Sequence, residues 1–473
     1  MNQIKRKIVG NFILSLLGRC FSVGLGIVAL SFTIRTLGID SFGEYNVVLT
    51  ILYILSVCGS FGLDALLVQK IGQEKALANE NEIIARIFFS RSVTVSLFLL
   101  LGGVGVFFLP YSFMIRGGVV LVLLGGFFSS LAQLLVGILQ KHLKMSVVVY
   151  AEIGMRCIQL FASWYLYYRE ATLFPFLLVF GVANIFYFIV IYYWVKRITG
   201  FSFRIRREWI MPTLSQGWPF AISVLLTLIY FRGGTIFLSL LQSAHDVGIY
   251  SMAYRVFENA LFIPIAFVGL IMPFLSRHGS LQKKDFCAVF QDAFNFLSII
   301  TIPFIVGGIY FSRDIILLIA GKTFHEALIA LQILFVALFF VFFGALFGQA
   351  VIALEKQKKV LWVYGTGSVL SIIGNAYFIT HYSYRGAAWM TVVIEMIITG
   401  GLWYLIYKTI RFLPSFVIFG KALLASLCMV VVFFLFSSWH FLILIGVGMI
   451  VYFVCMYLLG AFSAITHYVY EEI

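Results

Sequence analysis

Long apolar stretches, separated by short polar segments, follow one another along the whole chain. A helix needs about 20 apolar residues to cross a bilayer, and these stretches reach that length. Within residues 93–108, positions 97–108 are continuously apolar, whereas a strand of a membrane barrel alternates apolar and polar positions. The pattern predicts an all-α polytopic membrane protein with about fourteen transmembrane helices. The expected spans are 9–34, 43–68, 87–109, 117–139, 147–168, 173–195, 214–241, 248–275, 290–311, 327–353, 361–380, 386–407, 416–437 and 440–462.

The composition excludes a soluble or disordered chain. Of the 473 residues, 62% are hydrophobic and 11% are charged, against about 25% charged residues in a soluble domain. The formal net charge is +14, which in a soluble protein suggests nucleic acid. Here the basic residues lie mainly in loops between apolar spans, so we expect membrane anchoring and no nucleic-acid partner.

The distribution of Lys and Arg predicts the orientation. Cytoplasmic loops are enriched in these residues, and the enriched loops are those that share a side with the N-terminus. The longest is 196–212, with Lys196, Arg197, Arg204, Arg206 and Arg207. Lys5-Arg6-Lys7 resembles the start of a signal peptide, but the apolar run that follows is too long for one. We therefore expect both termini in the cytoplasm.

Two short patterns recur in the same order in both halves of the chain. Gly43-Glu44-Tyr45 opens the second span and Gly248-Ile249-Tyr250 opens the eighth. Leu139-Gln140-Lys141 and Leu354-Glu355-Lys356 follow the fourth and tenth spans. An even number of spans separates the copies, which favours a parallel repeat. The predicted organisation is a six-helix lobe at 1–195, a basic cytoplasmic linker at 196–212, a second six-helix lobe at 213–412, and two further helices with a short tail at 413–473.

An ordered set of motifs resembles one family of membrane proteins. The set comprises Leu37-Gly38, Phe42-Gly43-Glu44-Tyr45, Phe61-Gly62-Leu63, Tyr230-Phe231-Arg232, the run Val247 to Arg255, Pro273-Phe274-Leu275-Ser276, Ala320-Gly321-Lys322, Asn375 and Gly386-Ala387-Ala388. The chain is similar to the bacterial oligosaccharide-lipid flippases, the polysaccharide branch of the multidrug/oligosaccharidyl-lipid/polysaccharide exporter superfamily. In similar proteins an Asp often stands two residues after the Arg of the seventh span, and here that place is Gly234.

The resemblance implies two lobes around a central cavity and a location in the bacterial inner membrane. It implies transport of undecaprenyl-pyrophosphate-linked oligosaccharide from the inner to the outer leaflet by alternating access. The glycan would be a repeat unit of O-antigen in lipopolysaccharide, of capsule or of exopolysaccharide. Besides this substrate and membrane lipids, the implied partners are the polymerase and chain-length proteins of the same pathway.

Charged residues inside the spans are the candidate site, because a charge in the membrane is costly and usually faces a wet cavity or a partner. A cationic path suits a sugar pyrophosphate, and an Arg fork binds its oxygens through several donors. Structural ion pairs are the alternative, since Glu152–Arg156 and Arg255–Glu258 have helical pair spacings. The candidate substrate-binding residues are Arg19, Arg91, Arg156, Arg232 and Arg255. The candidates for ion or proton coupling are Asp64, Glu258 and Glu395.

Other chemistries have weaker support. The six cysteines contain no CxxC pair and no two histidines have metal-ligand spacing, so we expect no metal and no cofactor. A multidrug or cation antiporter of the related branch would favour buried carboxylates, whereas here the mid-span charge is mainly cationic. A polysaccharide polymerase or ligase would carry a large outer loop, and the longest expected outer loop, 312–326, is short. We therefore expect a transporter and no enzyme; a scaffold has little use for mid-membrane arginines.

Overall fold

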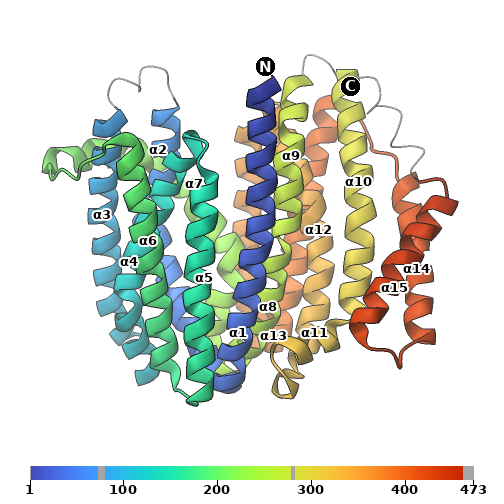
Figure 1. Cartoon of the computed structure of the whole chain (residues 1–473), viewed down its shortest axis with the longest axis horizontal. Helices are drawn as coiled ribbons and strands as arrows, with labels where there is room; N and C mark the ends of the chain where they lie inside the picture. Colours follow the sequence, from blue (N-terminus) through green and yellow to red (C-terminus); the bar gives the residue numbers. More distant parts are fainter. Residues whose placement is uncertain (1, 73–79, 279–282, 462–473) are drawn as a thin grey trace. The chain divides into compact units, whose positions relative to one another are not determined.

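The computed structural model describes residues 2–72, 80–278 and 283–461 (Figure 1). Helices account for nearly all of these residues, and none of them lies in a strand. Twelve helices in the described part are long and apolar enough to cross a membrane, judged by length and composition. The predicted all-α polytopic fold is confirmed.

Two helices are long enough to hold two expected spans each. Helix α1 runs Asn2–Ser60 and α13 runs Gln357–Ile410, and each contains one non-helical residue, Gly38 (φ 70°) and Ser383 (φ 50°). Glycine adopts a positive φ without steric cost, which explains the break at Gly38. These breaks fall between the expected spans 9–34 and 43–68, and between 361–380 and 386–407. Because α1 and α13 each hold two expected spans, the twelve continuous apolar helices agree with the predicted number of about fourteen spans.

Two further breaks fall where the sequence predicted continuous spans. The second expected span ends early at Ser60, because Phe61 and Gly62 have positive φ, and a short helix follows. The eighth span is divided at Leu261. Pro264 lacks the N–H that would bond to Ala260, and its ring would meet that carbonyl, which accounts for this break.

The remaining elements follow in chain order. They are α2 (Leu63–Ile71), α3 (Glu80–Gly105), α4 (Phe113–Lys141), α5 (Met145–Tyr168), α6 (Leu173–Thr199), α7 (Ile210–Leu241), α8 (Ala244–Ala260), α9 (Phe262–His278), α10 (Lys283–Tyr310), α11 (Ser312–Ile319), α12 (Ala327–Ala353), α14 (Val417–Leu435) and α15 (Phe441–Leu458). Short 3₁₀ turns are η2 (Val106–Phe108), η3 (Arg207–Trp209) and η4 (Lys322–Phe324).

The chain forms two compact units, which meet in sequence at Gly248 and Ile249. In the first unit, α1 packs against α3, α4, α5 and α7, and α4 packs against α6. Helix α7 lies in this unit because it also packs against α2 and α3. The unit therefore extends beyond the expected linker at 196–212, and the division into two six-helix lobes stays a prediction.

Gly43 and Gly248, the glycines of the repeated pattern, pack against each other's segments in the first unit. A side chain on Gly43 would overlap the Ala244 carbonyl, and one on Gly248 would overlap the Ile39 carbonyl. Gly43 thus contacts the residue four positions before Gly248, and Gly248 contacts the residue four positions before Gly43. The contact is therefore reciprocal, and both positions require a residue without a side chain.

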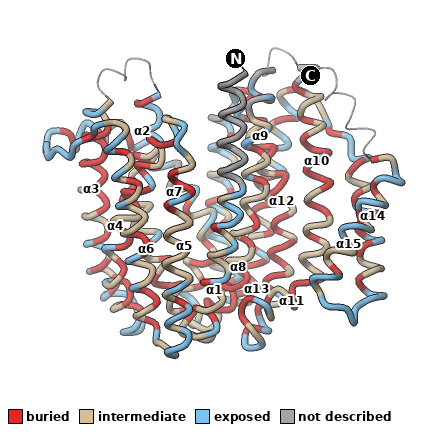
Figure 2. The backbone as a smooth tube through the Cα atoms, viewed as in Figure 1, coloured by how far each residue is buried: buried red, intermediate tan, exposed pale blue. Residues whose placement is uncertain are grey.

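The second unit is organised around α12, which is buried along its length (Figure 2). It packs against α13, α10 and α9. The two C-terminal helices, α14 and α15, pack against each other, and α14 packs against α10. Two tyrosines fix them: Tyr310 donates to the Phe433 carbonyl at 3.0 Å and Tyr452 to the Ile299 carbonyl at 2.8 Å.

Candidate functional site

Three charged side chains of the first unit interact between α1 and α5. The carboxylate of Glu152 on α5 interacts electrostatically with two arginines. One is Arg19 of α1, and the other is Arg156, one turn along the same helix. Arg156 also donates from Nη1 to Gln159 Oε1 at 2.9 Å. The half-buried Tyr187 of α6 lies within electrostatic reach of Glu152 and Arg19. Two guanidinium groups against one carboxylate leave this cluster with a net positive charge.

Glycines on α1 make room for this cluster. A Cβ on Gly26 would lie 3.3 Å from Arg156 Nε, so the guanidinium lies over that glycine. Eight residues earlier, a Cβ on Gly18 would overlap Val149 of α5. Small residues allow two helices to approach closely in a membrane. The close approach of α1 and α5 therefore sets the place of Arg156.

Arg232 of α7 lies over an aromatic ring of α1. Its guanidinium carbon is 4.9 Å from the centroid of Tyr53. Arg232 is half-buried and Tyr53 is 43% exposed. A cation over a tyrosine face is stabilised by the ring quadrupole. The contact holds the guanidinium of α7 against the ring of α1.

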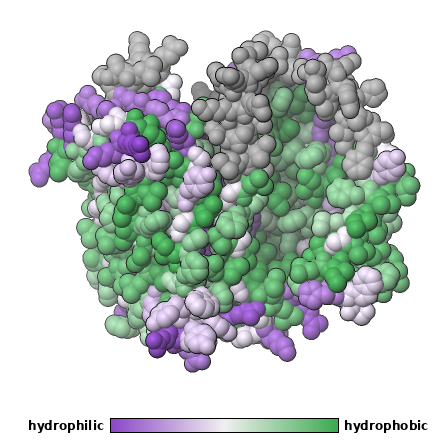
Figure 3. Space-filling model, in the orientation of Figure 1, coloured by the Kyte–Doolittle hydropathy of each residue, from purple (hydrophilic) through white to green (hydrophobic). Residues whose placement is uncertain are grey.

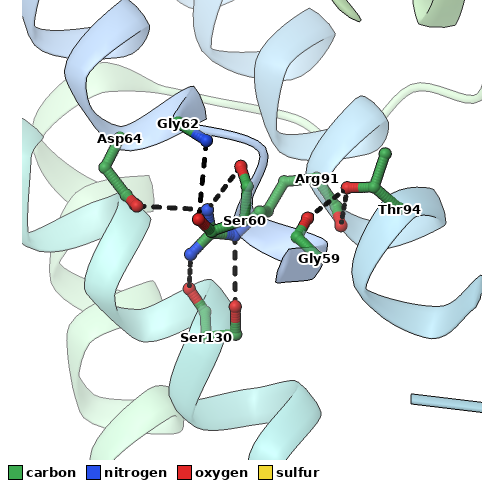
Figure 4. A network of polar contacts seen from close by, with 7 residues as sticks. All are labelled: Gly59, Ser60, Gly62, Asp64, Arg91, Thr94 and Ser130. Atoms are coloured by element: carbon green, nitrogen blue, oxygen red, sulfur yellow. Dashed lines mark hydrogen bonds and ion pairs between the residues drawn. The ribbon is translucent and has the colours of Figure 1, made fainter. Parts of the chain in front are cut away.

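Arg91 and Asp64, predicted for different roles, are joined in one buried network (Figure 4). Arg91 of α3 donates to Asp64 Oδ2 of α2 at 3.1 Å and to the Ser60 carbonyl at 2.9 Å. It also donates to the hydroxyl and carbonyl of Ser130 on α4, at 3.1 and 3.2 Å. Thr94 donates to the Gly59 carbonyl at 2.6 Å.

The Arg91 side chain is 1% exposed, whereas that of Asp64 is 43% exposed. These hydrogen bonds of Arg91 connect α3 to protein groups of α1, α2 and α4. This geometry holds four helices together. A role of Arg91 in binding the substrate on entry stays a prediction. Because the Arg91 side chain is buried, a ligand would reach the pair from the exposed side of Asp64.

In the second unit, Arg255 and Glu258 lie on adjacent turns of α8. Arg255 Nη1 and Glu258 Oε2 are 3.6 Å apart, and the two side chains are 31% and 24% exposed. Asn259 donates to the Arg255 carbonyl at 2.8 Å. The helical pairing alternative that the sequence offered is thus present here. Both side chains are thus only partly covered by the protein.

Glu395 of α13 is 4% exposed. Tyr364, from the other half of α13, lies within its electrostatic reach, and a Cβ on Gly348 of α12 would lie 3.6 Å from the Tyr364 hydroxyl. Thr399, one turn after Glu395, donates to the Phe340 carbonyl of α12 at 2.8 Å. Glu395 is therefore a buried carboxylate at a helix interface.

One polar contact joins a loop to a helix at the end of the first unit that was predicted to be outside. Tyr111, between the spans Glu80–Phe108 and Phe113–Lys141, contacts Ser239 Oγ of α7 through its hydroxyl at 3.4 Å. Burial raises the pKa of the Tyr111 hydroxyl above its usual value. The hydroxyl therefore stays neutral at physiological pH.

Sequence reasoning missed the partners that come from other helices. Tyr53 beneath Arg232, Ser130 beside Arg91 and Tyr364 near Glu395 have no spacing in the sequence that connects them to these charges. Local pairs were found because helical spacing brings residues three or four apart onto one face. Among the described residues, no three His, Cys, Asp or Glu side chains are grouped to hold a metal ion.

A family comparison decides the affiliation of the chain. The model of the polysaccharide biosynthesis protein family matches residues 8–278, more than half of the sequence. The chain belongs to this family. A comparison with curated protein sequences gives no significant match.

Solved structures share the fold. The lipid II flippase MurJ in an inward closed conformation superposes with a TM-score of 0.77, at 17% identity, over 94% of this chain and 98% of that one. An inward-facing multidrug resistance MATE family transporter gives 0.62 at 16% identity, over 81% and 94%. A MOP superfamily transporter from Pyrococcus furiosus gives 0.56 at 15% identity, over 86% and 97%. This member of the polysaccharide biosynthesis protein family thus has the fold of the MOP superfamily.

Proposed function

We propose that this protein flips undecaprenyl-pyrophosphate-linked oligosaccharide from the inner to the outer leaflet of the bacterial cytoplasmic membrane. One observation carries the proposal: a chain of the polysaccharide biosynthesis protein family has, over 94% of its length, the fold of a lipid II flippase. The similarity to that flippase is greater than to the MATE transporters, at 0.77 against 0.62. A lipid-linked glycan is a substrate of the same chemical kind.

The arginines supply what such a substrate needs. A pyrophosphate that enters hydrocarbon without counter-charge would be prohibitively unstable. Arg232 over Tyr53 and the Arg19–Arg156 pair place guanidinium groups inside the spans of the first unit. Arg255 adds one in the second unit. These groups bind the pyrophosphate by charge-assisted hydrogen bonds, while the polyprenyl chain stays in the lipid.

Movement proceeds by alternating access of two lobes around a central cationic path. Asp64, Glu258 and Glu395 are the candidates that couple this movement to a proton or another cation. Glu395 is the strongest of the three because it is 4% exposed. Charging or neutralising a buried carboxylate changes the free energy of its surroundings by more than it does at an exposed position.

The proposal includes the orientation of the chain, its substrate and its partner proteins. Both termini lie in the cytoplasm, and the substrate is a repeat unit of O-antigen, capsule or exopolysaccharide. Polymerase and chain-length proteins of the pathway receive the flipped product. We propose transport without catalysis, because a lipid-linked glycan can cross unchanged.

A cation antiporter is the second candidate. The buried carboxylate of Glu395 favours it, because a cationic drug or ion needs an anionic site. The mid-span positive charge of the first unit opposes it. Dye efflux in cells that express the protein distinguishes this function from the flippase.

The test is the leaflet position of the lipid-linked oligosaccharide. A strain that lacks the protein is complemented with the wild type, with Arg232→Ala or with Arg169→Ala. The last is a matched control, since Arg169 also lies over a ring, 5.6 Å from the centroid of Tyr165, at an exposed helix end. A membrane-impermeant glycosidase applied to spheroplasts and to inverted vesicles reports the exposed glycan.

We expect the intermediate to face the cytoplasm in the strain without the protein and in the Arg232→Ala strain. The wild type and Arg169→Ala restore exposure on the outer face. Normal outer exposure without the protein would refute the flippase. Trapping without the protein, but not with Arg232→Ala, would leave the flippase standing and remove Arg232 from the path.

A further inference from the structure

The connection between α6 and α7 is an ordered basic segment. Residues 200–209, here called the basic strap, carry Arg204, Arg206 and Arg207, and Lys196 and Arg197 precede them at the end of α6. All five of these side chains are exposed. Figure 1 shows the strap as the green segment beside the end of α3, and Figure 3 shows hydrophilic side chains gathered at that end of the first unit.

Buried residues fix both ends of the strap. Gly200 has φ 66° and ends α6. Phe201 is 0% exposed, with its ring 5.3 Å from Phe88 of α3. At the other end, Trp209 is 8% exposed, and its carbonyl accepts from Thr213 at 2.6 Å. Arg86 of α3 donates to the same Thr213 hydroxyl at 3.0 Å.

Apolar and basic side chains alternate along the strap. Phe203 lies on the same side of the strap as Phe201. Its ring contacts the rings of Phe88 and Phe89 edge-on, with centroid distances of 5.9 and 6.1 Å. Even so, it remains 46% exposed, and Ile205 is 71% exposed. Arg204 and Arg206 fall at the intervening positions, as in extended chain. The strap therefore lies along the side of α3 with apolar and cationic groups both uncovered.

The charges of the neighbouring elements leave the strap positive. Glu208 is the acidic residue within it, and Glu82 is exposed at the start of α3. Glu80 is engaged by Lys141 at 3.0 Å and by His142 at 3.1 Å. Arg206 lies over Trp209 at 5.3 Å. The described surroundings thus supply fewer anions than the strap has cations.

We propose that the basic strap is a docking surface for the anionic phospholipid headgroups of the surrounding bilayer. The strap connects two membrane-crossing helices, so it lies at the level of the headgroups on whichever side it faces. Juxtamembrane basic clusters bind anionic lipids, and exposed apolar residues enter the boundary of the acyl chains. The occupant belongs to the bilayer and differs from the transported glycan lipid, so this inference does not rest on the proposed function.

The test measures lipid binding to the full chain in detergent. The protein is titrated separately with dioleoylphosphatidylglycerol and dioleoylphosphatidylcholine, and bound lipid is counted by native mass spectrometry. The strap variant is Arg204→Gln/Arg206→Gln/Arg207→Gln. The matched control, Arg169→Gln/Arg313→Gln/Arg385→Gln, removes three exposed arginines from other helix ends.

We expect the wild type and the control to bind phosphatidylglycerol more tightly than phosphatidylcholine. The strap variant weakens binding of phosphatidylglycerol by at least about tenfold and leaves phosphatidylcholine unchanged. The variant Phe203→Ser/Ile205→Ser keeps the charges and weakens the binding of both lipids to a similar extent. If the strap variant does not fold, high salt applied to the wild type gives the same selective loss, because salt screens exposed charges.

Two results would overturn the proposal. One is equal binding of the two lipids by the wild type, which would point to an acidic protein segment as the occupant. The other is an equal loss in the strap variant and in the control, which would show that net charge, and not this surface, attracts the lipid.

Discussion

Arg91 Nη1 lies 3.1 Å from Asp64 Oδ2, yet the arginine side chain is 1% exposed and the aspartate side chain 43%. A buried guanidinium thus depends on a carboxylate that reaches the surface. The other contacts of Arg91, to Ser60 and Ser130, are neutral acceptors on α1 and α4. Asp64 is the charge that balances Arg91, and this dependence makes the pair asymmetric.

The asymmetry predicts how a single and a double variant compare in stability. Asp64→Ala should destabilise the protein by about 3 kcal/mol, because it leaves a buried charge without its partner. Arg91→Met/Asp64→Ala should be less destabilised than Asp64→Ala alone, since the unpaired charge is gone. Thermal unfolding in detergent measures both. A melting temperature of the double variant below that of Asp64→Ala would show that Arg91 does not depend on Asp64 for its stability.

The ring beneath Arg232 predicts graded effects on transport. Tyr53→Phe keeps the aromatic face and should transport like the wild type. Tyr53→Leu removes a cation–π contact of about 0.5–2 kcal/mol and should lower the rate severalfold. The rate of appearance of glycan on the outer face is the measurement, with Tyr165→Leu beneath Arg169 as the control. Equal rates for Tyr53→Leu and the wild type would mean that the ring does not position Arg232.

The cluster of Arg19, Glu152 and Arg156 predicts opposite shifts in affinity. Glu152→Gln removes the carboxylate between two guanidinium groups, so binding of a pyrophosphate lipid should tighten. Arg156→Gln should weaken this binding by about tenfold to a hundredfold, because a charge-assisted contact of about 1.5–3 kcal/mol is lost. Titration of purified protein with undecaprenyl pyrophosphate measures both. Shifts in the same direction would identify the cluster as a structural ion pair.

The close packing at Gly43 predicts a steric effect. Gly43→Ala places a methyl group on the Ala244 carbonyl, which should destabilise the protein by about 1–3 kcal/mol. Gly24→Ala, on the same helix but with open space around the new Cβ, should be neutral or stabilising. Thermal unfolding compares the two. Equal melting temperatures would show that the segments separate without cost.

Buried Glu395 predicts a role in coupling. Glu395→Gln should abolish the dependence of transport on a proton or sodium gradient while the protein remains folded. Glu355→Gln, at an exposed turn between α12 and α13, is the control. Transport in proteoliposomes with and without each gradient gives the answer. An unchanged response of Glu395→Gln would remove this residue from coupling.

Much of the fold was predictable from the sequence, because spans in a membrane are specified by length and hydropathy. The breaks at Gly38 and Ser383 fall between expected spans. The breaks at Phe61-Gly62 and Leu261 lie inside expected spans. There the apolar run continues, and backbone conformation decides the end of the helix. Hydropathy does not report that conformation.

By itself, the sequence determined that the chain is a helical membrane protein with arginines and carboxylates inside its spans. It also offered the local pair Arg255–Glu258 as one of two interpretations, because helical spacing is a property of the chain. The tertiary structure alone decided that Arg91 is held by Asp64 and Ser130, that Arg232 lies over Tyr53, and that Arg19 acts on Glu152. These partners come from different helices, and packing between helices has no period in the sequence from which it could be read.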